Sequence, residues 1–524
     1  METPSNEPNF GLLPIIASSN RTGNKYAKIS ELNPSLEKSS VTIRARLTTC
    51  RTKGNILFLI LRQKFFTVQA IISKSNEASD PMLKFAESIT KESIVDITGY
   101  IVKCDVISTT QKDVEIHVKS LFVVSMAEQL PIQVADCEIA QPLLDAQTKT
   151  MQVINEKIEI EKAKLETATN EKDKRKINIV IERLVKEKST NCKYATVSQK
   201  ERLDNRIIDL RTTTNQAIFR IQAGVCSMFR DYLNNCGFTE IHTPKLIGAA
   251  SEGGSDVFKV QYFDQNAYLA QSPQLYKQMT ICGDMDRVFE IGHVFRAENS
   301  MTHRHLTEYI GLDIEMTINE HYHEILDVLD AMFISIFDTL ETKYKPEIDV
   351  VRKQFPSKTF EYTRPSVRLH FNEAVELLRQ DQIPVDDLQD LSTVQERRLG
   401  ELVKAKYHTD FFILDKFPSN ARPFYAMDDP IDPNYTNSYD FFIRGQEVLS
   451  GGQRIHDYEL LKKKAIEKGI QLNSIQSYID AFKYGVAPHG GGGIGLERVV
   501  MLYIGLDNIR KTSMFPRDPS RLNP

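Results

Sequence analysis

Two segments of the chain concentrate charged residues in a pattern that could bind an anion and a cation side by side. The first, RVFEIGHVFRAENSMTHRHLTEYIGLDIEM, covers residues 287–316 and is typical of a strand, a loop and a second strand. Arg296 and Glu298 stand where the first strand ends. Asp313 and Glu315 alternate along the second strand, so their carboxylates would share one face. The pattern predicts a polar pocket, although Arg/Glu pairs on neighbouring strands are also common surface ion pairs.

The second segment, SYDFFIRGQEVLSGGQRIHD, covers residues 438–457 and places two acidic residues before a serine and an arginine. Asp440 and Glu447 could share a hard cation such as Mg²⁺, which accepts carboxylate and phosphate oxygens as ligands. Ser450 and Arg454 suit an anion better, since a guanidinium clamps a carboxylate through two parallel hydrogen bonds. Taken singly, each of these residues is more often a surface residue than a ligand.

The glycine-rich segment HGGGGIGLERV, residues 489–499, is a third candidate and could be either a linker or a site. No glycine completes a GxGxxG dinucleotide fingerprint after Gly493, and the sequence has no GxxxxGK[ST] loop. Nucleotide phosphates would therefore be bound by arginines and a metal ion. A zinc site formed by His303, His305 and a carboxylate is a weaker alternative, because nothing supplies tetrahedral ligand spacing.

The elements that would position these residues fall into four parts. Residues 1–38, rich in Asn, Ser, Pro and Glu, are expected to form a flexible N-terminal extension. Residues 39–126 contain five β-branched, partly alternating segments, which predict a five-stranded β-barrel of the OB-fold type. Residues 127–200 form a connector, and helices and strands intermix over residues 201–524.

The connector is expected to contain a hairpin of two amphipathic helices. Apolar residues recur at helical spacing along two stripes, Met151, Ile154, Ile158 and Leu165 on one and Ile177, Ile181 and Leu184 on the other. A polar break near Thr169 and Asn170 separates them. The charged surface of the hairpin could contact RNA or protein, but a solvated pair of antiparallel helices is the simpler interpretation.

Composition excludes several classes of protein. The 524 residues carry a formal net charge of -4, which argues against a protein that coats nucleic acid along its whole surface. The seven cysteines form no CxxC pair, which is typical of reduced thiols in a cytoplasmic protein. The N-terminal residues lack the basic start of a signal peptide, and no apolar run approaches the roughly 20 residues of a membrane span. We expect a cytoplasmic protein without a membrane anchor, zinc or haem.

Three motifs, in order along the chain, carry a resemblance to a known family. A predicted helix and strand end at Pro244, residues 295–298 read FRAE, and residues 493–498 read GIGLER. These resemble motifs 1, 2 and 3 of the class II aminoacyl-tRNA synthetases. The chain is most similar to the eukaryotic cytosolic aspartyl-tRNA synthetases of subclass IIb, over about 39–140 and 200–524. The hairpin is longer than the usual connector of that family, and the lysine-rich N-terminal helix of some relatives is missing.

This resemblance implies an α+β protein: an OB-fold barrel that binds the anticodon, followed by a class II catalytic domain built on an antiparallel β-sheet flanked by helices. It implies an ATP-dependent aspartate–tRNA ligase, which makes aspartyl-adenylate and diphosphate from L-aspartate and ATP. The aspartyl group would then pass to the 3′ terminal adenosine of tRNA-Asp, releasing AMP. ATP would act with Mg²⁺, and the place of motif 1 at a two-fold interface in the family predicts a homodimer.

The resemblance also implies roles in ATP binding. Arg296 and Arg498 would be the catalytic residues, Arg296 at the α-phosphate and Arg498 at the γ-phosphate. Asp440 and Glu447 would bind Mg²⁺. The glycine strand would let ATP approach the backbone closely. The residues expected to bind ATP are Arg296, Ala297, Glu298, Arg304, His305, Leu306, Tyr309, Glu447, Gly495, Leu496, Glu497 and Arg498.

Selection of aspartate would depend on two cations, Lys277 and Arg454, which would face the side-chain carboxylate of the substrate. The segment SEGGSDVF, residues 251–258, resembles a mobile loop that closes over aspartate, with Glu252 reaching the substrate and Gly253 and Gly254 permitting the movement. The residues expected to bind aspartate are Glu252, Gln274, Lys277, Arg296, Asp313, Ser450 and Arg454.

Anticodon recognition would involve three residues of the barrel. Phe58 would stack on a base, and Gln69 and Glu115 would recognise base edges. Phe58 could instead be an ordinary aromatic of the barrel core.

Several alternatives stay open at this point. The nearest enzymes are the asparaginyl- and lysyl-tRNA synthetases, and Lys277 together with the segment LSGGQR favours aspartate over both. A non-catalytic relative that keeps the fold for RNA or protein binding is a third, although such proteins tend to lose the motif arginines and metal carboxylates. The sequence leaves open whether tRNA-Asn is also charged, what the hairpin does, and whether other synthetases associate with this chain.

Overall fold

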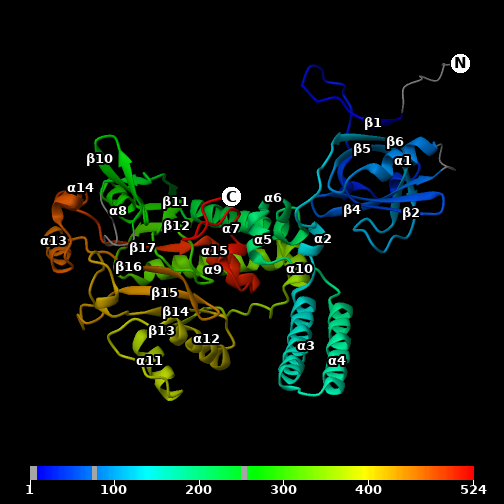
Figure 1. Cartoon of the computed structure of the whole chain (residues 1–524). Coiled ribbons are helices and arrows are strands. Elements are labelled where there is room, and N and C mark those ends of the chain that lie inside the picture. The colour runs from blue at the N-terminus through cyan, green and yellow to red at the C-terminus, as the bar shows by residue number, and fades with distance from the viewer. Residues whose placement is uncertain (1–8, 74–78, 249–256) are drawn as a thin grey trace. The chain divides into compact units, whose positions relative to one another are not determined.

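The computed structural model describes residues 9–73, 79–248 and 257–524. The chain forms two compact units, Met1–Cys137 with Val197–Gln216, and Glu138–Thr196 with Ala217–Pro524 (Figure 1). The helical connector therefore groups with the larger unit, whereas residues 201–216 group with the barrel. Within the described ranges, no helix combines the length and the apolar character that a membrane span requires.

The first unit contains the predicted five-stranded barrel. Its strands follow the order β6-β4-β3-β2-β5, and a further pairing between β5 and β6 closes the barrel. Only β4 and β6 run parallel among these pairs. The elements of this unit are β1 (Phe10–Leu12), β2 (Ser40–Lys53), β3 (Ile56–Gln63), β4 (Phe66–Ser73), α1 (Asp80–Ser88), β5 (Ile94–Lys103), β6 (Val114–Ser125), α2 (Val134–Cys137), α5 (Gln199–Asp204) and α6 (Arg206–Asp209).

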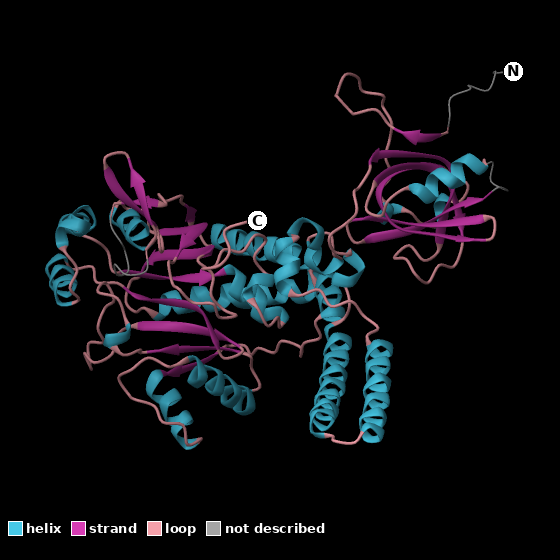
Figure 2. Ribbon diagram, viewed as in Figure 1, coloured by secondary structure: helices cyan, strands magenta, loops and turns pink. Residues whose placement is uncertain are grey.

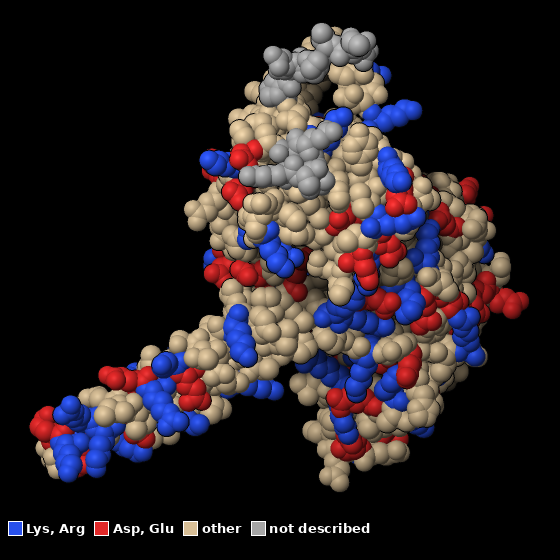
Figure 3. All heavy atoms as spheres, turned by 90° about the vertical axis from the view of Figure 1, so that its right-hand side faces the viewer, with Lys and Arg blue, Asp and Glu red and all other residues tan. Residues whose placement is uncertain are grey.

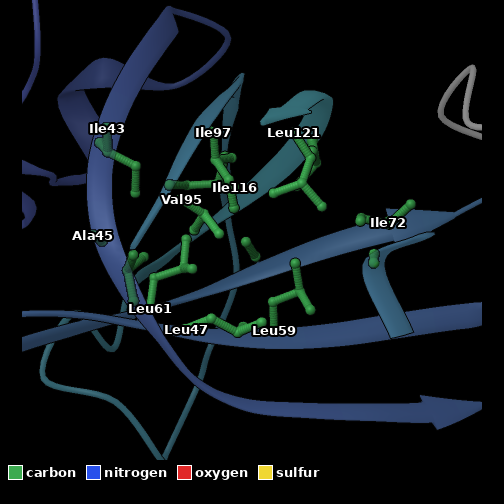
Figure 4. Packing of buried hydrophobic residues seen from close by; sticks show 14 of the residues in the cluster. Ile43, Ala45, Leu47, Leu59, Leu61, Ile72, Val95, Ile97, Ile116 and Leu121 are labelled. Carbon is green, nitrogen blue, oxygen red and sulfur yellow. The ribbon is translucent and has the colours of Figure 1, made fainter. Parts of the chain in front are cut away.

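The barrel core follows from strand alternation. Ile43, Ala45 and Leu47 of β2 are buried, and they meet apolar residues that alternate in the same way along the other strands. Figure 4 shows these side chains filling the interior of the barrel. The β-branched composition of the segments thus produces one closed apolar layer.

Residues 9–38 are part of this barrel, which corrects the expectation of a flexible extension for that stretch. β1 pairs in parallel with β6, with Phe10 opposite Leu121. Farther along, Ile29 and Leu32 are buried in the barrel core. These two buried side chains hold the segment on the barrel together with backbone hydrogen bonds, from Leu13 to Val123 and from Ala27 to Thr42, both at 2.8 Å. The polar residues around them dominate the average composition and conceal this packing.

The connector forms the predicted hairpin from α3 (Gln141–Thr167) and α4 (Glu171–Asn191) (Figure 1). Ile154 and Ile158 are buried between the helices, and the side chain of Asn170 caps α4 by accepting a hydrogen bond from the backbone of Lys172. The helix pair, at the lower left of Figure 3, carries Lys and Arg intermingled with Asp and Glu. The hairpin is therefore a solvated helix pair with a narrow apolar seam.

The second unit is built on an eight-stranded sheet with the order β13-β14-β15-β16-β17-β12-β11-β7. The six central strands are antiparallel, whereas the edge strands β7 and β13 pair in parallel with their neighbours. The antiparallel sheet that was predicted is thus present, with parallel edges. Its strands are β7 (Thr239–Glu240), β11 (Arg287–Phe295), β12 (Glu308–Thr317), β13 (Val367–His370), β14 (Phe411–Asp415), β15 (Ser438–Ile443), β16 (Gln446–Gln453) and β17 (His489–Gly495).

Helices flank this sheet, and a small three-stranded sheet accompanies it (Figure 2). The small sheet consists of β8 (Leu246–Ile247), β9 (Lys259–Tyr262) and β10 (Gln265–Leu269). The α-helices of this unit beyond the hairpin are α7 (Thr213–Asn235), which begins in the first unit, α8 (Gln274–Cys282), α9 (His323–Lys343), α10 (Lys345–Gln354), α11 (Phe371–Gln380), α12 (Thr393–Tyr407), α13 (Tyr458–Glu467), α14 (Gln476–Ala481) and α15 (Leu496–Ile504). Because α15 follows β17 directly, the last strand fixes the direction in which the helix presents Arg498.

Candidate active site

A cavity of about 500 Å³ is lined by residues of β11, β12, β16 and β17, by the start of α15, and by the loops that follow β11 and precede β15. It unites the three segments that the sequence singled out. The predicted site residues that line it are Gln274, Arg296, Glu298, Arg304, His305, Leu306, Tyr309, Asp313, Glu447, Ser450, Arg454, Gly495, Glu497 and Arg498. Residues from 274 to 498 therefore form one polar chamber.

Four predicted residues stand behind this lining, and one cannot be placed. Lys277, Ala297, Asp440 and Leu496 are outside the set that forms the wall. Glu252 and the two glycines after it lie outside the described residues. Most of the expected loop that closes over aspartate thus lies outside the described residues.

One end of the cavity is organised around a buried carboxylate, Glu315. Its oxygens accept hydrogen bonds from Arg454 at 2.9 and 3.3 Å, and Lys277 lies 3.4 Å from Oε2. Burial by itself would raise the pKa of Glu315, but Arg454 and Lys277 hold it below its ordinary value. The carboxylate thus fixes two cations in an interior where an unpaired charge would be costly.

Asp313 shares Lys277 with Glu315 and borders the cavity. Its Oδ1 accepts a hydrogen bond from Lys277 Nζ at 3.0 Å. Asp313 and Glu315 lie on the same face of β12, as their spacing predicted. Sequence reasoning noticed Glu315 but gave it no ligand role. Its position two residues after Asp313, on the same strand face, is the sequence signal that could have identified it.

A layer of neutral hydrogen-bonding groups lies beside Arg454. Gln274 accepts from Arg454 at 3.2 Å and donates to Gln278 at 2.9 Å. The amide of Gln278 in turn donates to His489 Nε2 at 3.2 Å. Burial lowers the pKa of His489, so this imidazole is a neutral member of the layer. Gln278 and His489 were not predicted from the sequence, and neither lines the cavity.

The other end of the cavity contains the arginines of the loop after β11 and of α15. The guanidinium of Arg296 lies 5.7 Å from the ring centroid of Tyr309 and 4.0 Å from Glu298. Arg498 donates to the backbone oxygens of Glu447 at 3.0 Å and Arg304 at 3.5 Å. These backbone bonds orient Arg498 without neutralising its charge, which leaves a cation directed toward the cavity.

Asp440 is held by a residue that the sequence did not reveal, Arg422. Arg422 donates to Asp440 Oδ2 at 2.8 Å and to Ser450 Oγ at 2.8 Å. Among the described residues, Oδ1 of Asp440 has no hydrogen-bond partner. Burial, and after it the nearby carboxylate of Glu447, raises the pKa of Asp440 to about 7 in spite of Arg422. Arg422 comes from an irregular loop, where no periodic pattern could have identified it.

The carboxylates of Asp440 and Glu447 fit a divalent cation that also binds phosphate oxygens. A nearby cation would bind the unpartnered oxygen of Asp440 and lower its raised pKa. The described part of the chain contains no group of three or more His, Cys, Asp or Glu placed to hold a metal. Two carboxylates completed by phosphate oxygens suit Mg²⁺, which binds few protein ligands.

The glycine run is a central strand of the sheet and not a linker. A Cβ at Gly491 would lie 2.0 Å from the backbone oxygen of Ile314 and 2.5 Å from Glu315 Oε2. A Cβ at Gly493 would lie 3.1 Å from Asp313 Oδ1. The strand must therefore lack side chains at these positions, so that Asp313 and Glu315 of β12 fit beside it. Gly493 and Gly495 border the cavity, so the expected approach of a ligand to the backbone concerns this end of the run.

The three residues predicted to read an anticodon lie close together on the barrel. Gln69 and Glu115 are paired in register on β4 and β6, and Gln69 donates to Glu115 at 2.9 Å. Phe58 of β3 is half-buried, whereas Leu57 and Leu59 on either side are fully buried. Phe58 therefore points away from the barrel core, which removes the alternative of a core aromatic.

Comparison with known proteins agrees with this geometry. The family model of the tRNA synthetases class II (D, K and N) matches residues 198–519, and that of the OB-fold nucleic acid binding domain matches residues 41–124.

Individual relatives are similar over nearly their whole length. The cytoplasmic aspartate–tRNA ligase 1 of Dictyostelium discoideum is 50% identical, over 100% of this chain and 89% of the relative. The human cytoplasmic aspartate–tRNA ligase is 48% identical, over 98% and 94%. Among solved structures, the aspartyl-tRNA synthetase from Entamoeba histolytica is similar with a TM-score of 0.84 and 47% identity, over 99% and 97%. The chain belongs to the class II tRNA synthetases of the D, K and N type.

Proposed function

We propose that the protein is an aspartate–tRNA ligase, which activates L-aspartate with ATP and transfers it to tRNA-Asp. The observation that carries this proposal is the cavity with Arg454 and Asp313 at one end and Arg296 and Arg498 at the other. Lys277 stands behind the first end and pairs with Asp313. An amino acid with a second carboxylate fits the first end, and the phosphates of ATP fit the second. The full-length similarity to aspartate–tRNA ligases supports the same substrate.

Activation needs positioning more than acid–base catalysis. The α-carboxylate of aspartate is ionised at neutral pH, so it can attack the α-phosphorus of ATP without a general base. The new bond joins the carboxylate oxygen to that phosphorus, and the bond to diphosphate breaks. Arg296 would stabilise the charge that develops on the α-phosphate, and Arg498 would hold the γ-phosphate.

Further cavity residues would hold the nucleoside and the metal. Glu298, His305 and Tyr309 would bind the adenine, and the ring of Tyr309 offers a stacking surface. Asp440 and Glu447 would hold Mg²⁺, which when bound would neutralise part of the phosphate charge.

Aspartate would be preferred to asparagine because of the cations that face its side chain. Arg454 and Lys277 already pair with the carboxylates of Glu315 and Asp313, so the selectivity would come from the hydrogen bonds that the guanidinium of Arg454 offers at the cavity. Asparagine would bring an amide nitrogen, which cannot accept a hydrogen bond from the guanidinium, and one buried hydrogen bond would be lost. We expect discrimination of about 10⁴-fold, the scale reached when buried polar groups lose their partners.

The second step and the assembly complete the proposal. The aspartyl group would move to a hydroxyl of the terminal adenosine of tRNA-Asp, releasing AMP. The barrel would read the anticodon through Phe58, Gln69 and Glu115. We also propose that the protein is cytoplasmic, as the names of its relatives suggest. The place of motif 1 at a two-fold interface in the family suggests that it is a homodimer.

Aspartate-dependent exchange between labelled diphosphate and ATP tests the activity directly. We expect exchange with aspartate and Mg²⁺, and at most a trace with asparagine or lysine. Faster exchange with asparagine or lysine than with aspartate would show that the proposed substrate is wrong. A folded protein that is inactive with all three amino acids would indicate a non-catalytic relative. Charging purified tRNA-Asp and tRNA-Asn in parallel determines the tRNA, and light scattering of the active protein determines whether it is a dimer.

A further inference from the structure

The helix α12 forms two hydrogen bonds to the loop that follows β11, on the side away from the cavity. Glu396 Oε2 accepts a hydrogen bond from Arg304 Nη1 at 3.2 Å. The next residue, Arg397, donates to Nε2 of His303 at 2.7 Å. Two consecutive residues of one helix thus hold two consecutive residues of the loop.

Glu396 stands behind the cavity wall. Arg304 lines the cavity, whereas the side chain of Glu396 is 11% exposed and is not part of the lining. A ligand in the cavity would meet the guanidinium of Arg304 and not the carboxylate behind it. Any influence of Glu396 on a ligand must therefore pass through Arg304.

The position of α12 is fixed by close backbone packing. A Cβ at Gly400 would lie 2.4 Å from the Cα of Gly445, and a Cβ at Gly445 would lie 2.9 Å from the backbone oxygen of Glu396. Gly445 also has a positive φ of 68°, in the tight turn between β15 and β16. This turn leads directly to Glu447 at the cavity. The strand pair that presents Glu447 therefore also positions Glu396.

Burial and neighbouring charges shift the pKa values of both Glu396 and His303. Burial raises the pKa of Glu396 to about 7, the nearby Glu447 adds to the rise, and Arg304 opposes it. Burial, followed by the charge of Arg397, lowers the pKa of His303, so a neutral imidazole accepts the hydrogen bond from Arg397. The loop is thus held by the buried carboxyl of Glu396 and by a contact between Arg397 and a neutral imidazole.

We propose that Glu396 is a positioning residue for ATP, which directs the guanidinium of Arg304 toward the triphosphate, while Arg397 holds the loop through His303. The inference rests on the proposed function and deepens it. A long arginine side chain has many rotamers, and a fixed carboxylate behind it selects one of them. Phosphate binding then loses less side-chain entropy, so the effect belongs to ATP affinity.

Two substitutions of Glu396 measure the effect. Glu396→Ala removes the carboxylate, and we expect the KM for ATP in the exchange reaction to rise about tenfold, the scale of one charge-assisted hydrogen bond. The kcat and the KM for aspartate should stay within about twofold, since those terms do not involve Arg304. Glu396→Gln keeps the shape and an acceptor, so it should recover part of the loss.

The matched control is Glu401→Gln on the same helix. Glu401 is 67% exposed and pairs with Arg398 at 2.6 Å, away from the cavity lining. We expect its KM for ATP to equal that of the wild type. Melting temperatures of all variants separate a loss of stability from a loss of ATP affinity, and Glu396→Gln keeps the test valid if the alanine variant does not fold.

A double variant tests the route through Arg304. If Glu396 acts only through that arginine, Glu396→Ala with Arg304→Ala should bind ATP no more weakly than Arg304→Ala alone. Fully additive losses, an equal rise in the KM for aspartate, or an unchanged KM for ATP would each overturn the inference. Absence of exchange in the wild type would instead contradict the proposed function, and calorimetric ATP binding by the same variants would still decide the role of Glu396.

Discussion

At the scale of single residues, Arg498 is a cation of the cavity that is oriented by backbone groups. Its hydrogen bonds run to the backbone oxygens of Glu447 and Arg304, so no carboxylate neutralises it through those contacts. We expect Arg498→Ala to slow aspartate-dependent exchange by about 10²-fold or more, the scale of a lost transition-state charge contact. The matched control, Arg379→Ala, removes an exposed arginine that pairs with Asp387. Exchange kinetics that are equal in the two variants would contradict the role.

A second prediction at the residue scale concerns the stability contribution of Asp440. Its pKa is about 7 in the folded chain, against an ordinary value of 3.8. Between these values the folded state binds a proton that the unfolded state lacks, so the free energy of unfolding falls as the pH rises toward 7. The asparagine of Asp440→Asn cannot ionise, so the free energy of unfolding of this variant should fall less steeply with rising pH than that of the wild type.

Urea unfolding of the wild type and of Asp440→Asn from about pH 5 to about pH 8 measures how the free energy of unfolding changes with pH. A difference in stability that does not depend on pH leaves this slope unchanged. Glu396 and Glu497, whose pKa values are also raised to about 7, contribute equally to both proteins. Parallel stability curves would show that Asp440 keeps an ordinary pKa.

At the scale of elements, the bare strand β17 determines whether the acids of β12 can be buried. A Cβ at Gly491 would meet backbone as well as Glu315, and backbone in the middle of a sheet cannot rotate away. We therefore expect Gly491→Ala to lower the free energy of unfolding by about 3 kcal/mol, the upper range for overpacking a core. Gly248→Ala is the control, because a Cβ there would meet no atom of the described residues within 4 Å. Equal denaturation midpoints for the two variants would contradict this account.

The elements also show how far a sequence can be interpreted. The five barrel strands, the hairpin and the strand–loop–strand around Arg296 were predictable because each has a regular period of apolar residues. β1 was not, since three residues paired to a distant strand carry no period. Arg422 and Glu396 were missed for a related reason. Arg422 lies on an irregular loop 18 residues before Asp440, and Glu396 lies on a helix 92 residues after Arg304, so only the fold brings them to these partners.

At the scale of the whole molecule, the two units divide the proposed reaction between them. Every lining residue of the cavity lies in the second unit, whereas Phe58, Gln69 and Glu115 lie in the first. Substitutions in the barrel should therefore affect the transfer to tRNA and spare the activation of aspartate.

Phe58→Ala tests this division of labour. Loss of one base-stacking surface is worth about 1–3 kcal/mol, so the KM for tRNA-Asp should rise roughly 5- to 100-fold while diphosphate exchange stays at the wild-type rate. The control is Phe66→Ala, which removes another partly exposed aromatic of the same barrel, 38% exposed on β4. A Phe58 variant that charges tRNA normally would remove the stacking role. One that also loses exchange would show that the units are coupled, because the barrel would then influence a cavity to which it contributes no lining residue.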